Sequence, residues 1–270
     1  MRSSSLTVAA VQTAALPYDK GKLDYYLTIA KSKGAKVVLF GEYVLNLFFK
    51  ELAHTSPKLI EDQTRHHYEA LKNAAFVYHL TIVAPMVLKS RGGFKKSLVR
   101  FSPAMVKTHD QQLLMPYPHW NEAAFFTNRS SSLTLPLFQV DGFKIAMMMG
   151  FELHFDPLWE MARKKRVDAV LLPTASTFES APRWREIIKT RAFLNSLYVI
   201  RVNRTGHHTY DDQTWQFYGD SLVANPFGDV EEALGNKEEV LLATIERPIL
   251  TEARRAWGFD RILKNHASKE

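Results

Sequence analysis

Short apolar, β-branched runs alternate with longer amphipathic stretches along the whole chain, and this alternation constrains the fold more than any other feature. Residues 6–13 have the composition of a buried strand, and residues 36–40 form a second such run. Between them, Leu23, Tyr26, Leu27 and Ala30 recur at the spacing of an amphipathic helix over residues 22–33. This interleaving predicts one α/β or α+β domain in which helices cover sheets.

The alternation of strand-like and helix-like runs continues to the end of the 270 residues. Arg91-Gly92-Gly93 is typical of a hairpin turn, and Asp156-Pro157 of a helix start in which Asp156 is the N-cap. Because no linker or repeat interrupts the pattern, we predict a single domain over 1–270 with a charged C-terminal tail from about 258. The expected helices are 59–80, 158–165, 183–195 and 249–257, and the expected strands are 81–87, 96–101, 104–108, 137–140, 144–149, 169–172, 198–203, 221–224, 230–231 and 240–245.

The chain contains no cysteine, which excludes disulfides, thiolate metal sites and a cysteine nucleophile. Its 35 Lys and Arg residues against 28 Asp and Glu residues give a net charge of +7. The densest basic run, residues 163–166, falls at the end of an expected helix, where cations interact favourably with the helix dipole. We therefore do not expect a nucleic-acid partner.

Targeting and cofactor signals are not found in the sequence. The first apolar run ends at Gln12, too early for a signal peptide, and the most apolar stretch, 74–88, is too short and too often interrupted for a membrane span. We expect a cytoplasmic protein without a membrane partner. Glycine-rich phosphate-binding motifs and the Gly-x-Ser-x-Gly nucleophile motif are missing, and the adjacent His66-His67 and His207-His208 pairs point apart, so we expect no cofactor and no metal.

Several segments, in order and over nearly the whole chain, resemble the nitrilase superfamily of carbon–nitrogen hydrolases. This resemblance implies a four-layer αββα sandwich, and homodimers or higher oligomers that pair through outer helices. Trp159, Met161, Ile249, Trp257 and Phe259 are the residues we expect at such an interface. The resemblance rests on residues 8–12, 38–43, 147–155, 168–174, 184 with 189–195, 198–199, 203–206 and 218–221 with 225–228.

The resemblance also assigns catalytic positions. Members of the superfamily use a glutamate as base, a lysine that stabilises negative charge and a cysteine nucleophile. Glu42 occupies the base position, and Glu122 resembles a second glutamate found in many members. The lysine position falls on Gln111, or on Gln112 one residue further, and the nucleophile position falls on Gly150. Lys107 lies four residues from Gln111, about 13 Å along a strand, too far to replace the missing charge.

The residues next to these positions are candidates for ligand binding: Tyr43, Trp120, Phe151 and Thr174. An aromatic cluster of this size also suits a hydrophobic core. Glu42 and Glu122 could likewise have a structural role in place of a catalytic one. For Glu42, that role would be to end a strand and hydrogen-bond a neighbouring loop. We expect Glu152 to anchor the turn after Gly150 by hydrogen bonds to the backbone.

Three functions remain open at this point. The chain is a catalytically degenerate family member that binds a small amide-like or amine-like ligand, a hydrolase that activates water directly through Glu42 or Glu122, or an interaction subunit with only a dimerising surface. Without the cysteine and the lysine, we expect no hydrolysis of simple amides, nitriles or N-carbamoyl amines. An open cavity above Gly150 would favour a binding protein or an altered enzyme. A space filled by side chains would favour the interaction subunit.

Overall fold

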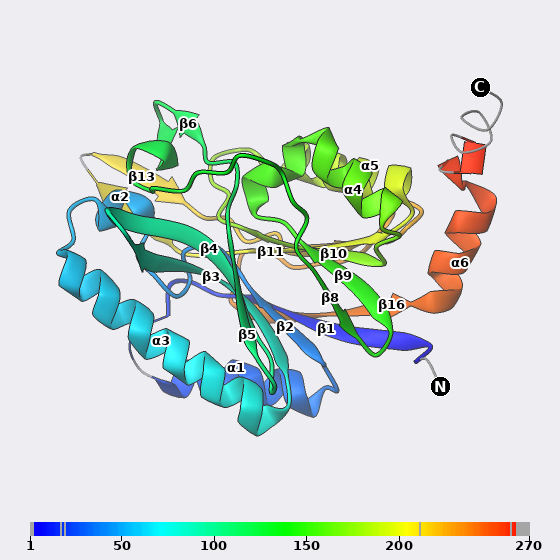
Figure 1. The fold of residues 1–270 in the computed structure, drawn as a ribbon, viewed down its shortest axis with the longest axis horizontal. Coiled ribbons are helices and arrows are strands. Elements are labelled where there is room, and N and C mark those ends of the chain that lie inside the picture. Colours follow the sequence, from blue (N-terminus) through cyan, green and yellow to red (C-terminus); the bar gives the residue numbers. More distant parts are fainter. Residues whose placement is uncertain (1–2, 17, 19, 211, 260, 263–270) are drawn as a thin grey trace.

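Two six-stranded sheets form the centre of the molecule, with helices on their outer faces (Figure 1). The computed structural model describes residues 3–16, 18, 20–210, 212–259 and 261–262. The strand order is β16-β1-β2-β3-β4-β5 in one sheet and β15-β14-β11-β10-β9-β8 in the other. The inner strands of each sheet run parallel, as crossover connections through helices require, and the antiparallel pairs lie toward the edges.

The first sheet contains, in spatial order, β16 (Glu239–Glu246), β1 (Ser5–Gln12), β2 (Val37–Phe40), β3 (Thr81–Ser90), β4 (Gly93–Phe101) and β5 (Val106–Asp110). The second contains β15 (Val230–Ala233), β14 (Leu222–Ala224), β11 (Tyr198–Asn203), β10 (Ala169–Thr174), β9 (Phe143–Met147) and β8 (Leu137–Val140). The short hairpins are β6 (Pro116–Tyr117) with β7 (Trp120–Asn121), and β12 (His207–Tyr210) with β13 (Gln213–Gln216). The helices are α1 (Lys20–Ser32), α2 (Phe49–Leu52), α3 (Pro57–Tyr78), α4 (Asp156–Lys164), α5 (Ala181–Asn195) and α6 (Arg247–Ala256), with 3₁₀ turns η1 (Glu122–Ala124) and η2 (Gly150–His154).

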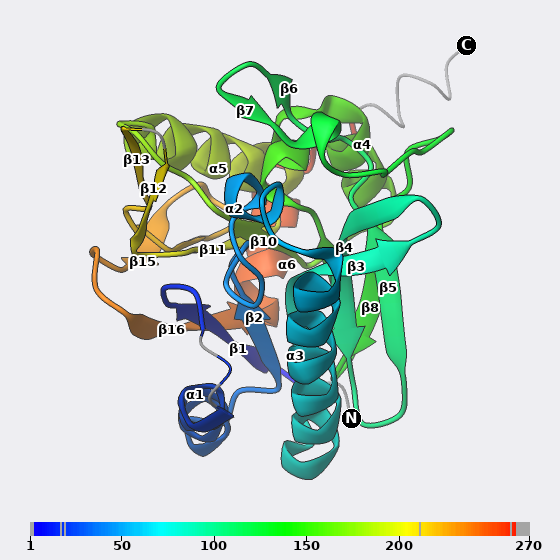
Figure 2. The ribbon, with the colours of Figure 1, turned by 90° about the vertical axis from the view of Figure 1, so that its left-hand side faces the viewer.

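Alternating side chains on each strand explain the layers. Val8 and Ala10 of β1 point into the core between the sheets, where residues such as Met147 of β9 meet them. Their neighbours Ala9 and Val11 point the other way, into a second core beneath α1 and α3. A third core lies between the second sheet and helices α4 and α5. Figure 2 shows these helices on opposite sides of the paired sheets. The predicted four-layer αββα sandwich is confirmed.

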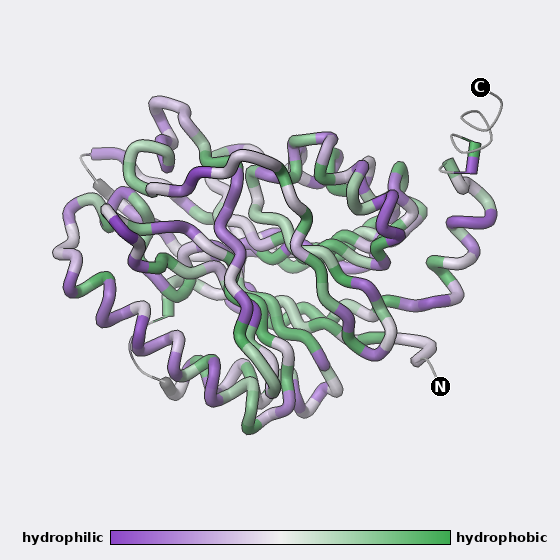
Figure 3. The backbone as a smooth tube through the Cα atoms, viewed as in Figure 1, coloured by the Kyte–Doolittle hydropathy of each residue, from purple (hydrophilic) through white to green (hydrophobic). Residues whose placement is uncertain are grey.

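Hydropathy follows the same layers, with apolar backbone concentrated in the central strands and polar residues along the outer helices (Figure 3). Both faces of the inner strands are covered, which is why β2 and β10 are buried over their whole length. Across the ranges that the structure describes, no helix combines the length and the apolarity needed to cross a membrane.

Most of the helices and strands expected from the sequence are present, but some begin or end at other residues than expected. Asp156 is the first residue of α4 and not its N-cap, which is Phe155, and the Asp156 carboxylate forms an ion pair with Arg191. The strand expected at 104–108 is β5, two residues later, since its pairing with β4 sets the register. The two short hairpins and α2 were not expected, because segments this short carry little periodic signal.

A buried histidine on α3 makes the stability of the fold dependent on pH. His67 is 1% exposed, and neither ring nitrogen has a hydrogen-bond partner among the described residues. Burial, with a smaller contribution from His66, lowers its pKa from 6.5 to about 4. The unfolded chain therefore binds a proton first, and stability is lost as the pH falls from about 6.5 to about 4.

We expect this loss to reach about 3 kcal/mol at pH 4. His67→Phe, which cannot take up the proton, should remove that part of the pH dependence in urea unfolding at pH 7 and pH 4. His119→Gln, at an exposed position on the β6–β7 hairpin, is the matched control and should leave it unchanged. If the His67→Phe protein lost as much stability between pH 7 and pH 4 as the unmodified protein does, groups other than His67 would cause the loss.

Candidate active site

Glu42 is placed between the two sheets by a tight turn after β2. A Cβ atom on Gly41 would lie 3.3 Å from both the Arg204 nitrogen and the Thr174 carbonyl oxygen, so glycine permits the close approach of the second sheet. The backbone N–H of Glu42 donates to the Thr174 oxygen at 3.2 Å. The carboxylate, 2% exposed as a residue, consequently lies in the interior.

A lysine bridges two buried glutamates at this point. The Lys96 ammonium donates to Glu42 Oε2 at 2.7 Å and to Glu122 Oε1 at 2.6 Å, and all three side chains are at most 3% exposed. The Tyr43 hydroxyl donates to the same Glu122 oxygen at 2.5 Å, and the ammonium lies 4.7 Å from the Tyr43 ring centroid. The ammonium thus offsets two carboxylates that could not otherwise both be buried as anions.

The pKa values of the bridged groups reflect this arrangement. Burial raises the pKa of Glu42, Lys96 opposes that effect, and the Glu122 carboxylate adds to it. Burial by itself would lower the pKa of Lys96, but the two carboxylates outweigh it and raise the pKa, so the lysine keeps its charge at neutral pH.

Gly150 lies at the start of the 3₁₀ turn η2, directly against Glu42. Its N–H donates to Glu42 Oε1 at 2.9 Å, and a Cβ atom there would lie 3.2 Å from that oxygen and 3.0 Å from the Thr174 methyl group. The turn is held by Glu152, which accepts hydrogen bonds from the N–H groups of Met149 and Gln112. The expected structural role of Glu152 is confirmed, and the base and nucleophile positions do meet.

The expectation that no ammonium reaches Glu42 is wrong. The side chain of Gln111, at the assigned lysine position, donates from Nε2 to the Leu113 oxygen. Lys96 lies opposite Gln111 on the adjacent strand, since the Gln111 N–H donates to the Lys96 carbonyl oxygen. The Lys96 side chain supplies the positive charge that Gln111 lacks. Strand alternation could have revealed this, because Lys96 shares its parity on β4 with Phe94 and Leu98, two buried apolar residues. Lys107 is exposed on β5.

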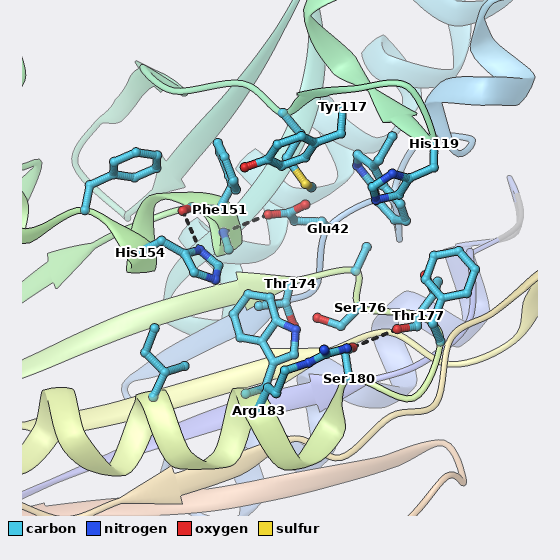
Figure 4. Close-up of a pocket in the computed structure, with 18 residues that line it drawn as sticks. Glu42, Tyr117, His119, Phe151, His154, Thr174, Ser176, Thr177, Ser180 and Arg183 are labelled. Atoms are coloured by element: carbon cyan, nitrogen blue, oxygen red, sulfur yellow. Dashed lines mark hydrogen bonds between the residues drawn. The ribbon is translucent and has the colours of Figure 1, made fainter.

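A cavity of about 700 Å³ opens above Gly150. Glu42 forms part of its floor, the β6–β7 hairpin and η2 form one side, and α5 forms the other (Figure 4). Trp120, Phe151 and Thr174 line it as expected. Tyr43 does not, because its hydroxyl is turned to Glu122 behind the floor. The lining residues are Glu42, Met115, Tyr117, His119, Trp120, Gly150, Phe151, His154, Phe155, Thr174, Ala175, Ser176, Thr177, Phe178, Ser180, Arg183, Trp184 and Ile187.

Within the described part of the chain, no group of three or more His, Asp or Glu side chains is arranged to hold a metal ion. The cavity floor presents the carboxylate of Glu42, which accepts hydrogen bonds from the Lys96 ammonium and from the Gly150 N–H.

Comparison with known proteins shows which family the chain matches. Residues 7–255 match the family model described as carbon-nitrogen hydrolase. The chain belongs to the carbon-nitrogen hydrolase family. The resemblance seen in the sequence is thus confirmed, and so is the amidase-like character of the fold.

The alignments with three members of known name extend over nearly the whole chain. Omega-amidase NIT2 from Danio rerio is 24% identical over 265 residues, which cover 94% of this chain and 92% of that protein. A carbon-nitrogen hydrolase from Helicobacter pylori G27 has a similar structure, with a TM-score of 0.82 at 20% identity over 95% of this chain and 94% of the other. An amidase from Nesterenkonia sp. AN1, solved as a cysteine-to-alanine variant in complex with butyramide, gives a TM-score of 0.75 at 18% identity over 93% and 97% of the two chains.

Proposed function

We propose that this family member binds a small amide in the cavity above Gly150 and does not hydrolyse it through a covalent intermediate. The observation that carries the proposal is glycine at the position next to the Glu42 carboxylate, in a chain that has no cysteine at all. An acyl-enzyme needs a nucleophilic side chain within reach of the base, and residue 150 supplies none.

The surroundings of Glu42 support amide binding. Its carboxylate lines the open cavity and can accept hydrogen bonds from the NH₂ group of a primary amide, while Lys96 favours the charged form of the carboxylate. The aromatic lining suits an apolar ligand body. An open cavity also favours ligand binding over a purely structural subunit. The Nesterenkonia amidase complex with butyramide supports the idea that this fold can hold an amide without the cysteine.

The second candidate is a hydrolase that activates water directly, which the retained Glu42–Lys96–Glu122 cluster favours. Glu42 would remove a proton from a water molecule while that water attacks the amide carbon, and would then give the proton to the amide nitrogen as the C–N bond breaks and ammonia leaves. Such an enzyme would do without covalent catalysis, and its turnover would be correspondingly slow.

Calorimetric titration with butyramide, together with an assay for released ammonia, tests both candidates. We expect saturable binding, no ammonia and no covalent adduct by mass spectrometry. Trp184→Ala, which enlarges the cavity, should weaken binding by about tenfold through lost apolar contact, whereas Trp257→Ala, just after α6, should leave it unchanged. Ammonia release that disappears in Glu42→Gln would replace the first candidate with the second.

We also propose that the chain forms homodimers. Phe193 of α5 packs against Trp257 and Phe259 after α6, and Trp257 remains 50% exposed, so this aromatic cluster offers apolar surface for a second copy. Light scattering at micromolar concentration should give twice the mass of one chain. A monomer would contradict this proposal and leave the proposed ligand binding unaffected.

A further inference from the structure

Four arginines line a second concavity, at the opposite end of α5 from the cavity above Gly150. This hollow has a volume of about 410 Å³ and lies where helices α4, α5 and α6 end. The arginines are Arg163 and Arg166 at the end of α4, Arg254 in the last turn of α6, and Arg261 beyond it. Among the described residues that line the hollow, none is acidic. We call it the arginine pocket.

The charge of the arginine pocket is only partly offset by the protein. Arg254 forms an ion pair with Asp168 at 3.0 Å and donates to the Val167 carbonyl oxygen at 2.7 Å. By contrast, no hydrogen bond or ion pair with a described residue engages the exposed guanidiniums of Arg166 and Arg261. A helix C-terminus attracts basic side chains, but it carries only about half a negative charge. Three helix ends and the Asp168 carboxylate therefore do not balance four guanidiniums.

A buried amide at the end of α5 adds an independent observation. Asn195 lines the arginine pocket and is 9% exposed. Its Nδ2 donates to the Arg191 carbonyl oxygen at 2.8 Å, but its Oδ1 has no hydrogen-bond partner among the residues that the structure describes. A buried acceptor normally has a partner, so this oxygen is available to a hydroxyl or N–H group that enters the pocket. The aromatic ring of Phe259 belongs to the same lining.

We infer that the arginine pocket binds a diphosphate group, as the inorganic ion or as part of a nucleotide. The planar guanidinium fork matches phosphate oxygens, and a diphosphate offers enough charged oxygens to engage several arginines at once. The basic run 163–166 divides accordingly, because Arg163 and Arg166 line the pocket and the two lysines between them do not. A hollow of this kind, in place of a basic stripe along the surface, favours a small ligand over nucleic acid. The inference does not depend on the proposed function of the other cavity.

Calorimetric titration of the whole protein with pyrophosphate tests the inference. We expect saturable binding at low salt that weakens as the salt concentration rises. Arg166→Asn should weaken it about tenfold through the loss of charge-assisted hydrogen bonds, and adding Arg261→Gln should weaken it about tenfold again. Asparagine suits residue 166, whose φ of 52° lies in the left-handed region, so the variant should fold. Lys165→Asn is the matched control, since it removes a neighbouring charge outside the pocket and should leave the affinity unchanged.

Two further arms locate the anion and its source. Arg183→Gln removes a cation from the lining of the cavity above Gly150 and should leave pyrophosphate binding unchanged. ADP should bind and adenosine should not, and the tighter of ADP and pyrophosphate identifies the source of the diphosphate. Failure of both to bind, or equal losses in Arg166→Asn and Lys165→Asn, would overturn the inference. Loss of binding in Arg183→Gln would also overturn it, because the anion would then occupy the other cavity.

Discussion

Replacing Lys96 with methionine is expected to lower the free energy of unfolding by about 3–5 kcal/mol at pH 7, because removing one partner from a buried ionic cluster leaves uncompensated charge. Two carboxylates, on Glu42 and Glu122, would then share a nearly dry interior with no cation beside them. Urea unfolding followed by circular dichroism measures the change. The penalty should shrink as the pH is lowered, since burial raises the pKa of Glu42 and the protonation of this carboxylate in the folded state relieves the repulsion.

The adjacent lysine provides the control. Lys95 pairs with Asp110 at the surface, with about a third of each side chain exposed, and Lys95→Met should change stability by less than about 1 kcal/mol. A triple variant that combines Lys96→Met with Glu42→Gln and Glu122→Gln should recover much of the loss, because it buries no net charge. Equal effects of the two lysine substitutions would mean that the ammonium of Lys96 is not the element that compensates the glutamates.

Introducing a thiol at residue 150 is expected to give this chain measurable amidase activity. In Gly150→Cys, the base, the ammonium and the nucleophile would all be present, because Lys96 already supplies the charge and no change at Gln111 is needed. The glycine does not have a positive φ, so its backbone accepts a side chain, but the Thr174 methyl group and the Glu42 carboxylate must shift by a few tenths of an ångström. The new cysteine is the only one in the chain, so a thiol reagent reports on this residue alone.

Ammonia release from butyramide should be detectable in Gly150→Cys and absent in the unmodified protein. Adding Lys96→Met to that variant should lower the rate about 10²–10³-fold, the typical effect of losing one group that stabilises the developing negative charge. Gly150→Ser is the matched control and should stay inactive, because a hydroxyl is a far weaker nucleophile than a thiolate. If Gly150→Ser and Gly150→Cys were equally active, the thiol would not be the missing group.

Local patterns in the sequence were sufficient for the layered fold, and the family resemblance located two of the catalytic positions. The alternation along β1 places Val8 and Ala10 in one core and Ala9 and Val11 in another, and such two-sided burial requires a layer on each face of the sheet. Glu42 lies two residues after the buried strand β2 and Gly150 three residues after β9, so the ends of these strands determine where the two residues lie. These features depend on neighbours in the chain, and periodicity reveals them.

Alternation along β4 indicates that the Lys96 side chain faces inward, but it does not identify the residues that this side chain meets. Gln111 and Lys96 are 15 positions apart in the sequence and lie opposite each other only because β4 and β5 pair in one register. The cavity likewise combines the β2 end, the β6–β7 hairpin, η2, the β10 end and α5, which are dispersed over 146 positions from Glu42 to Ile187 and meet only when the two sheets pack. The pairing of Arg185 with Asp220 and of Arg191 with Asp156 is equally invisible in the chain.

The sequence by itself therefore determined that no thiol chemistry is available, that helices and strands interleave in one layered fold, and that Glu42 and Gly150 follow buried strands. The tertiary structure decided that Lys96 neutralises the buried glutamates, that Tyr43 lies behind the cavity floor and not in its lining, and that the cavity above Gly150 is open. The physical reason is the range of the forces involved. Side-chain alternation is a property of consecutive residues, whereas the pairing of buried charges depends on strand register and sheet packing, which bring distant residues within hydrogen-bond distance.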